Sequence, residues 1–123
     1  MKTTKNYYIK KTEKLLGELD VSRNALAYLT SIQNDVNLPP HKAELRKKRI
    51  RYLTNTLDAV GHALELLDPT ERTVIERMCI RRTPGALDEV CEICGLEKSS
   101  VYRHRSRALK KLAAALYGEG EVV

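Results

Sequence analysis

The sequence predicts an all-α protein in which an N-terminal helical hairpin precedes a three-helix domain. The chain has 123 residues without any Trp or Phe, so its core has to come mainly from aliphatic side chains and Tyr. That composition favours helices that pack through aliphatic stripes, and the apolar residues recur at spacings of three and four. The net charge of +6 further predicts an anionic partner, either nucleic acid or a membrane surface.

The first 67 residues predict two helices that fold back on each other. A long helix is expected over residues 4–36, although Gly17 weakens its middle by roughly 1 kcal/mol relative to Ala. A break near Asp20 or Ser22 is the alternative, because either side chain can cap a new helix. Pro39 and Pro40 then end the helical pattern, since proline cannot continue a helix.

A second helix is predicted over residues 41–67. Its apolar stripe alternates by three and four and consists of Ile50, Leu53, Leu57, Val60, Leu64 and Leu67. Such a heptad-like seam packs on the first helix, and it can also join a second copy of the chain. We therefore expect residues 1–67 to serve oligomerisation, with a dimer as the expected state. The basic cluster Lys47–Arg51 has two readings of equal weight, a solvated surface or additional contacts to a DNA backbone.

Residues 68–117 predict three further helices. Asp68 is a capping residue, Pro69 fits the first helical position and Glu71 completes a capping box, so a helix is expected over residues 69–81. A short helix over residues 87–94 stops at Gly95, which tolerates a positive φ. A last helix covers residues 98–117, and residues 118–123 are expected to form a flexible tail.

The last two helices have the spacing of a helix-turn-helix, and the basic charge is concentrated there. Residues 97–117 carry six Lys or Arg against one acid. The first turns of a recognition helix reach base edges in the major groove, and flanking groups hold phosphates. The candidate base contacts are Lys98, Ser99 and Arg103, of which Arg103 can hold guanine as a bidentate pair. The candidate backbone contacts are Ser100, Tyr102, Arg105, Arg107 and Lys110.

The same segment resembles a known family. The pattern Leu-Asp-Glu-Val-x3-Cys-Gly-Leu-x4-Val-x6-Arg-Ala-Leu-Lys-Lys-Leu over residues 87–112 resembles region four of sigma-70-type sigma factors. The preceding Leu-Asp-Pro-x-Glu-Arg-x-Val-Ile over residues 67–75 is similar to the helix that opens that region. Small phage and prophage regulators of the ArpU and RinA type carry such a module after a charged helical segment. The resemblance implies a phage or prophage regulator that binds promoter DNA.

The resemblance is limited to about residues 64–116. Glu97 stands where sigma factors usually have Thr or Ser, so the cap of the last helix is lost unless Ser99 replaces it. His104 stands where primary sigma factors have an apolar residue. No segment resembles the sigma regions that bind the −10 element or the polymerase clamp, so the sequence does not predict a complete sigma factor.

These observations favour a sequence-specific transcriptional regulator that binds double-stranded DNA in the cytoplasm. The alternatives are a module that binds RNA polymerase or a sigma factor, and a DNA-packaging component similar to a small terminase subunit. No phosphate loop, nucleophile elbow or organised carboxylate pair is present, so we expect no enzyme, no catalytic residue and no cofactor. No apolar run approaches the roughly 18–20 residues of a transmembrane helix, so we expect no membrane association. Cys91 and Cys94 form a C-x-x-C, but the only further ligand candidates are Cys79 and His104, so no metal site is predicted.

Overall fold

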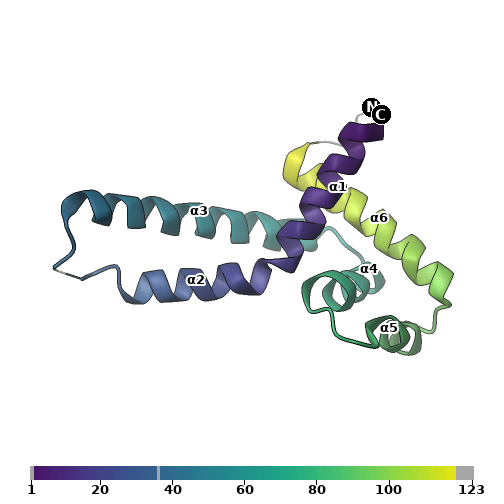
Figure 1. The fold of residues 1–123 in the computed structure, drawn as a ribbon. Coiled ribbons are helices and arrows are strands. Elements are labelled where there is room, and N and C mark those ends of the chain that lie inside the picture. The colour runs from purple at the N-terminus through teal and green to yellow at the C-terminus, as the bar shows by residue number, and fades with distance from the viewer. Residues whose placement is uncertain (1, 36, 119–123) are drawn as a thin grey trace.

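The fold was obtained as a computed structural model that describes residues 2–35 and 37–118, with side chains from residue 6 onward. The described residues form six α-helices and one π-helical turn, and they contain no strand (Figure 1). The predicted all-α class is therefore confirmed. Within the same residues, no helix is both long enough and apolar enough to cross a membrane.

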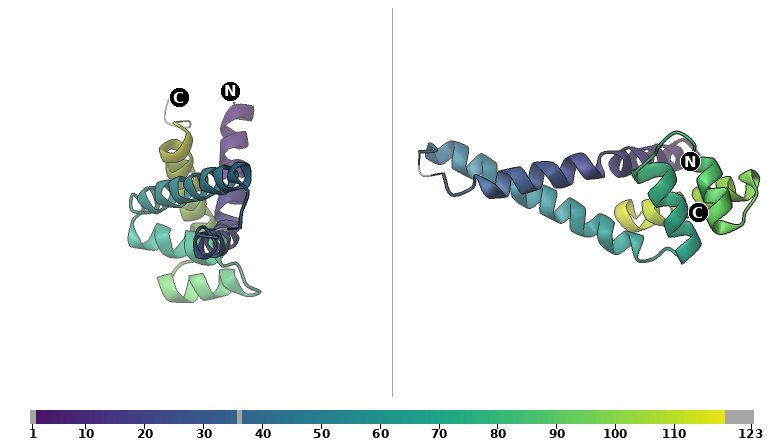
Figure 2. Two further views of the ribbon diagram at one scale, coloured as in Figure 1. Left: turned by 90° about the vertical axis from the view of Figure 1, so that its left-hand side faces the viewer. Right: turned by 90° about the horizontal axis from the view of Figure 1, so that it is seen from below.

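The elements follow one another with short connections. They are α1 (Lys2–Gly17), α2 (Leu19–Ser31), α3 (Pro40–Leu64), α4 (Pro69–Ile75), the π-helical turn η1 (Glu76–Ile80), α5 (Ala86–Cys94) and α6 (Lys98–Tyr117). The helices α2 and α3 lie side by side in opposite directions and extend away from the rest of the molecule (Figures 1 and 2). The other helices gather at the far end of this pair, where α1 packs on α6.

The predicted continuous helix over residues 4–36 is wrong, because the chain bends between α1 and α2. The bend lies at Glu18, whose φ of −98° and ψ of 4° are not helical, directly after Gly17. The alternative, a break near Asp20 or Ser22, is correct in kind, but the break lies two residues before Asp20, and neither Asp20 nor Ser22 caps the new helix because both lie within α2. Glycine weakens a helix interior, so the bend occurs where the helix is weakest. It turns α1 away from α3 and onto α6.

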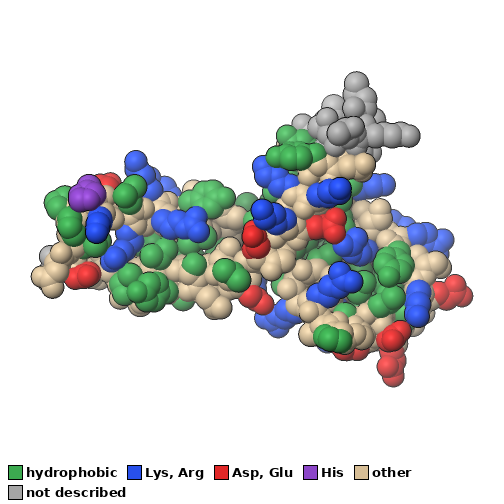
Figure 3. Space-filling view, in the orientation of Figure 1, with side chains coloured by type: hydrophobic (Ala, Val, Ile, Leu, Met, Phe, Trp, Pro, Cys, Tyr) green, Lys and Arg blue, Asp and Glu red, His purple; other side chains and the backbone are tan. Residues whose placement is uncertain are grey.

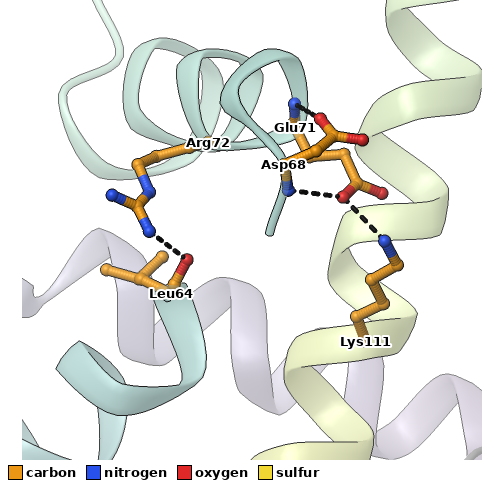
Figure 4. Close-up of polar contacts among 5 residues, drawn as sticks. All are labelled: Leu64, Asp68, Glu71, Arg72 and Lys111. Atoms are coloured by element: carbon orange, nitrogen blue, oxygen red, sulfur yellow. Dashed lines mark hydrogen bonds and ion pairs between the residues drawn. The ribbon is translucent and has the colours of Figure 1, made fainter. Parts of the chain in front are cut away.

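The start of α4 confirms the predicted capping box. The Asp68 carboxylate accepts a hydrogen bond from the Glu71 amide at 2.7 Å, and the Glu71 carboxylate accepts one from the Asp68 amide at 3.0 Å (Figure 4). The bond from the Glu71 amide lowers the pKa of the Asp68 carboxyl. The Arg72 guanidinium donates to the Leu64 carbonyl at 3.0 Å and so closes the turn between α3 and α4. The predicted helix over 69–81 is regular only to Ile75, because η1 follows it.

The main core joins both halves of the chain. Its buried members are Leu16, Leu19, Val60, Ala63, Leu67, Ile75, Ala108, Leu109 and Leu112. They come from α1, α2, α3, α4, α6 and the turn before α4. Residues on both sides of the predicted boundary between residues 67 and 68 thus share one hydrophobic core.

A second core fixes α5 against the start of α6. Its buried members are Val74, Met78, Ala86, Val90 and Val101, from α4, η1, α5 and α6. Because a rigid scaffold sets the direction of the side chains on its surface, this core determines how the first turns of α6 are presented. At its other end α6 stops at Gly118, which has a φ of 69°. Of the predicted tail over residues 118–123, residues 119–123 lie outside the described residues.

Candidate nucleic-acid interface

The connection between α5 and α6 is a tight turn of three residues. Gly95 ends α5 with a φ of 65°, and its amide and that of Leu96 both donate to the Cys91 carbonyl. This confirms the predicted stop at Gly95. A glycine suits this position because it adopts the left-handed conformation without steric cost. The helix α6 then begins at Lys98, after Glu97 in extended backbone.

The start of α6 has no side-chain cap. Glu97 occupies the capping position without bonding the amides of the first turn, and Ser99 does not replace it. A carboxylate cannot approach a phosphate without repulsion, so Glu97 disfavours a phosphate directly beside its own side chain. An anionic partner would therefore have to be contacted by the exposed face of α6.

One face of α6 carries a row of exposed polar and basic side chains. Ser99, Arg103, Ser106 and Lys110 are all exposed and are separated by four, three and four residues. Residues at that spacing lie on the same face of a helix. Buried residues occupy other faces of α6, namely Val101, Ala108, Leu109, Leu112 and Ala113. We call the row of Ser99, Arg103, Ser106 and Lys110 the α6 row.

The structure brings most of the predicted site residues to this side of α6. The three candidate base contacts, Lys98, Ser99 and Arg103, are exposed within its first two turns. Of the candidate backbone contacts, Tyr102, Arg107 and Lys110 are exposed, whereas Ser100 is half-buried. Among the residues that the structure describes, Arg103, Arg107 and Lys110 form no ion pair, so their charges are not neutralised locally.

Arg105 lies apart from the α6 row. Its guanidinium donates to the Glu13 carboxylate of α1 at 2.6 Å, and its side chain is only 25% exposed. Burial lowers the pKa of the Arg105 guanidinium, but the hydrogen bond with Glu13 and the electrostatic and hydrogen-bonding contributions of Glu13 and Cys79 together outweigh this effect, so the pKa ends above its usual value. At about 100° per residue, Arg105 points to nearly the opposite side of α6 from Arg103. We therefore leave Arg105 out of the interface proposed below.

Two features of the surface were not predicted. Ser106 occupies the middle of the α6 row, and its spacing from Arg103 is the signal that identifies it. Arg82 and Thr83 line a hollow together with Lys98 and Tyr102, beside the start of α5. Arg82 and Thr83 lie outside the predicted helices, so only the fold shows that they are neighbours of α6.

Acidic side chains border the basic surface on the α5 side. Asp88, Glu89 and Glu92 are exposed on α5, and the Lys98 ammonium lies 3.9 Å from the Asp88 carboxylate. Figure 3 shows red and blue side chains next to each other at this end of the molecule. Because acids repel phosphates, an anionic partner would be confined to α6 and its immediate neighbours.

The cysteines are part of the packing. Cys91 and Cys94 are half-buried against the second core, and Cys79 lies between the two cores. Burial raises the pKa of the Cys79 thiol, which disfavours its reactive thiolate form. In residues 2–35 and 37–118, no group of three or more His, Cys, Asp or Glu is placed to hold a metal ion.

No protein-family model, no curated protein and no solved structure matches this chain. The functional interpretation therefore depends on the residues themselves and on how the fold presents them.

Proposed function

We propose that this chain is a sequence-specific DNA-binding transcriptional regulator of the phage or prophage type. In this proposal α5 and α6 form a helix-turn-helix similar to region four of sigma factors, and α6 enters the major groove. The observation that carries the proposal is the α6 row, a line of unpaired donors that begins in the first turn after a tight glycine turn. The composition of the row favours DNA as the ligand, because cations bind phosphates and both cations and neutral donors bind base edges.

The two ends of α6 have different roles in the proposal. Lys98, Ser99 and Arg103 lie in the first two turns, from which recognition helices reach base edges. Arg107 and Lys110 follow one and two turns later and suit phosphate contacts, which contribute affinity but no sequence information. The row spans eleven steps of about 1.5 Å, or roughly 17 Å, which is longer than the roughly 12 Å width of the major groove, so its far end can reach a flanking phosphate backbone.

Replacing Arg103 with alanine is expected to weaken binding to the preferred DNA site by about 1–3 kcal/mol and to relax the choice of one base. The reason is the loss of a bidentate pair with a guanine. The matched control is Arg23→Ala, which also removes an exposed arginine but from α2 instead of α6. Fluorescence anisotropy with the preferred duplex and with single-base variants of it measures both effects. Unchanged binding of every duplex by Arg103→Ala would show that Arg103 does not contact bases.

The proposed function itself is tested by selecting bound duplexes from a random DNA pool. Enrichment of a defined motif is expected, and a palindromic motif would indicate two copies bound symmetrically. A pool that stays random after repeated rounds would overturn the proposal. The selection is run at a stated salt concentration, because phosphate contacts make affinity strongly salt-dependent.

The α2–α3 pair supports a dimer. None of the described side chains between Asp20 and Tyr52 is buried, and Val21, Tyr28 and Leu45 are 69%, 64% and 62% exposed. Figure 3 shows hydrophobic side chains at the surface of this pair. The outer part of such a helix pair, which has no buried residue, can gain a core by pairing with two more helices in a four-helix bundle.

We therefore expect sedimentation equilibrium to give the mass of a dimer. Tyr28→Glu together with Leu45→Glu is expected to give a monomer, because each adds a charge to an apolar contact. The matched control is Thr30→Glu with Lys42→Glu, which adds the same carboxylates at exposed polar positions of the pair. A monomeric wild-type protein would contradict the dimer, and a ring of many subunits would favour the packaging component instead.

A further inference from the structure

A cleft lies between α1, the middle of α3 and the end of α6. It has a volume of about 510 Å³, and its apolar part is formed by Leu15 and by three tyrosines, Tyr7, Tyr52 and Tyr117. A smaller hollow of about 220 Å³ shares Leu15, Tyr52 and Tyr117 and continues along α3. Since Lys98 and Tyr117 are nineteen residues apart on one helix, the cleft is about 29 Å from the start of α6. It is therefore separate from the surface proposed to read DNA bases.

The rim of the cleft is strongly basic. Lys10, Lys11 and Lys14 of α1 line it and are exposed, and Glu18 is the single acid among its lining residues. Cations around an apolar floor match a ligand that carries both carboxylates or phosphates and an apolar group. The composition of the cleft thus leaves two classes of macromolecule, an acidic peptide segment and a single strand of nucleic acid.

The aromatic rings of the cleft are already in contact with cations. The Lys11 ammonium lies 5.0 Å from the ring centroid of Tyr117 and 5.8 Å from that of Tyr7. Tyr8 packs on Tyr117 with centroids 5.3 Å apart, and the Arg49 guanidinium lies 5.8 Å from the centroid of Tyr52. Binding of single strands relies on ring faces that are open for base stacking. Because each tyrosine ring that lines the cleft already contacts a cation, fewer ring faces are open for base stacking, and the arrangement favours the acidic peptide.

The tyrosine hydroxyls add donors to the lysines. Burial and the neighbouring hydroxyls of Tyr52 and Tyr7 raise the pKa of the Tyr117 phenol. A phenol that stays protonated donates a hydrogen bond to a carboxylate, as a lysine ammonium does. Lysine ammonium groups and tyrosine hydroxyls can therefore both bind carboxylates of a ligand, while an apolar side chain of the same ligand covers Leu15.

We propose that this cleft is a docking site for a partner protein, which it binds through an acidic segment with an apolar side chain placed over Leu15. The proposal does not depend on DNA binding by α6, because the two surfaces use different residues. Docking at this end of α6 would leave the α6 row free for DNA.

A random twelve-residue peptide library displayed on phage, selected against the full chain, tests this proposal. The expected result is a consensus of Asp or Glu around one or more apolar residues. The enriched peptide, measured by fluorescence anisotropy, is expected to bind the Lys11→Glu, Lys14→Glu double variant at least about tenfold more weakly, since rim charges attract the ligand. Tyr52→Ala is expected to weaken it too, whereas Lys42→Glu with Lys48→Glu, at exposed positions on α3 outside the cleft, is the control and is expected to bind like wild type.

Three results would overturn the proposal. They are a selection without enrichment, a consensus that lacks acids, and a peptide that binds the Lys11→Glu, Lys14→Glu variant as tightly as wild type. A fluorescein-labelled strand of twelve thymidines is measured alongside. Binding of that strand which depends on Lys11 and Lys14 would show that the cleft accepts nucleic acid instead.

Discussion

Replacing Leu109 with alanine is expected to lower the free energy of unfolding by about 2–5 kcal/mol. Leu109 is 1% exposed and lies in the main core, where α6 meets helices from the N-terminal part of the chain. Removing its side chain leaves a cavity that the surrounding helices can fill only in part. Because a domain of this size has a total stability of about 5–15 kcal/mol, the loss is a large part of the whole.

Urea denaturation followed by circular dichroism measures this effect. The control is Leu66→Ala, which removes the same atoms from a side chain that is 62% exposed and is expected to cost much less. To keep any dimer constant, all variants are compared at one protein concentration. We expect a single transition, since α1 and α3 contribute to the same core as α6. Two unfolding transitions, of which Leu109→Ala shifts only one to lower urea concentration, would show instead that residues 1–67 and 68–117 unfold independently.

The sequence was sufficient to predict the features that depend on local chemistry. The capping box of Asp68 and Glu71 and the left-handed stop at Gly95 need only neighbouring residues, and both are present. The bend at Glu18 was anticipated only through the weak point at Gly17 and a break near Asp20, because its exact position depends on residues far apart in the sequence, such as Leu16 and the α6 residues that share its core. The π-helical turn after Ile75 has no signal in the apolar spacing that we could have used.

The limits of prediction are clearest on α6. From the sequence, Arg105 and Lys111 look like members of a uniform basic surface. In the structure Arg105 bonds Glu13, 92 residues away, and Lys111 bonds Glu71, 40 residues away. A helical pattern indicates which residues share a face, but it does not indicate which partner approaches that face. The division of the basic residues into structural and exposed ones therefore required the fold.

Replacing Lys111 with methionine is expected to lower the free energy of unfolding by about 3 kcal/mol, the lower end of the range for breaking a buried ion pair. The Glu71 side chain is 0% exposed, and its Oε1 accepts hydrogen bonds from the Lys111 ammonium at 2.8 Å and from the Asp68 amide at 3.0 Å (Figure 4). Without Lys111 the carboxylate stays buried without a counter-charge. The effect is not larger because the Lys111 side chain is itself 42% exposed.

A double-mutant cycle separates this charge effect from lost packing. Glu71→Gln removes the charge but keeps an oxygen that can accept from the Asp68 amide. Lys111→Met is therefore expected to cost about 1–3 kcal/mol less in the Glu71→Gln background than in the wild type, which is the coupling typical of groups in direct contact. Equal costs in both backgrounds would show that the ion pair does not stabilise the fold.

The adjacent Lys110 provides the matched control and links stability to function. Lys110→Met removes the same charge one residue earlier, from the exposed α6 row, and is expected to change the free energy of unfolding by less than about 0.5 kcal/mol. It is expected to weaken binding to all DNA sequences alike and to lower the salt dependence, because it removes a phosphate contact. If Lys110→Met instead destabilised the fold and left DNA affinity unchanged, the α6 row would have a structural role, and the proposed direction of α6 on DNA would be wrong.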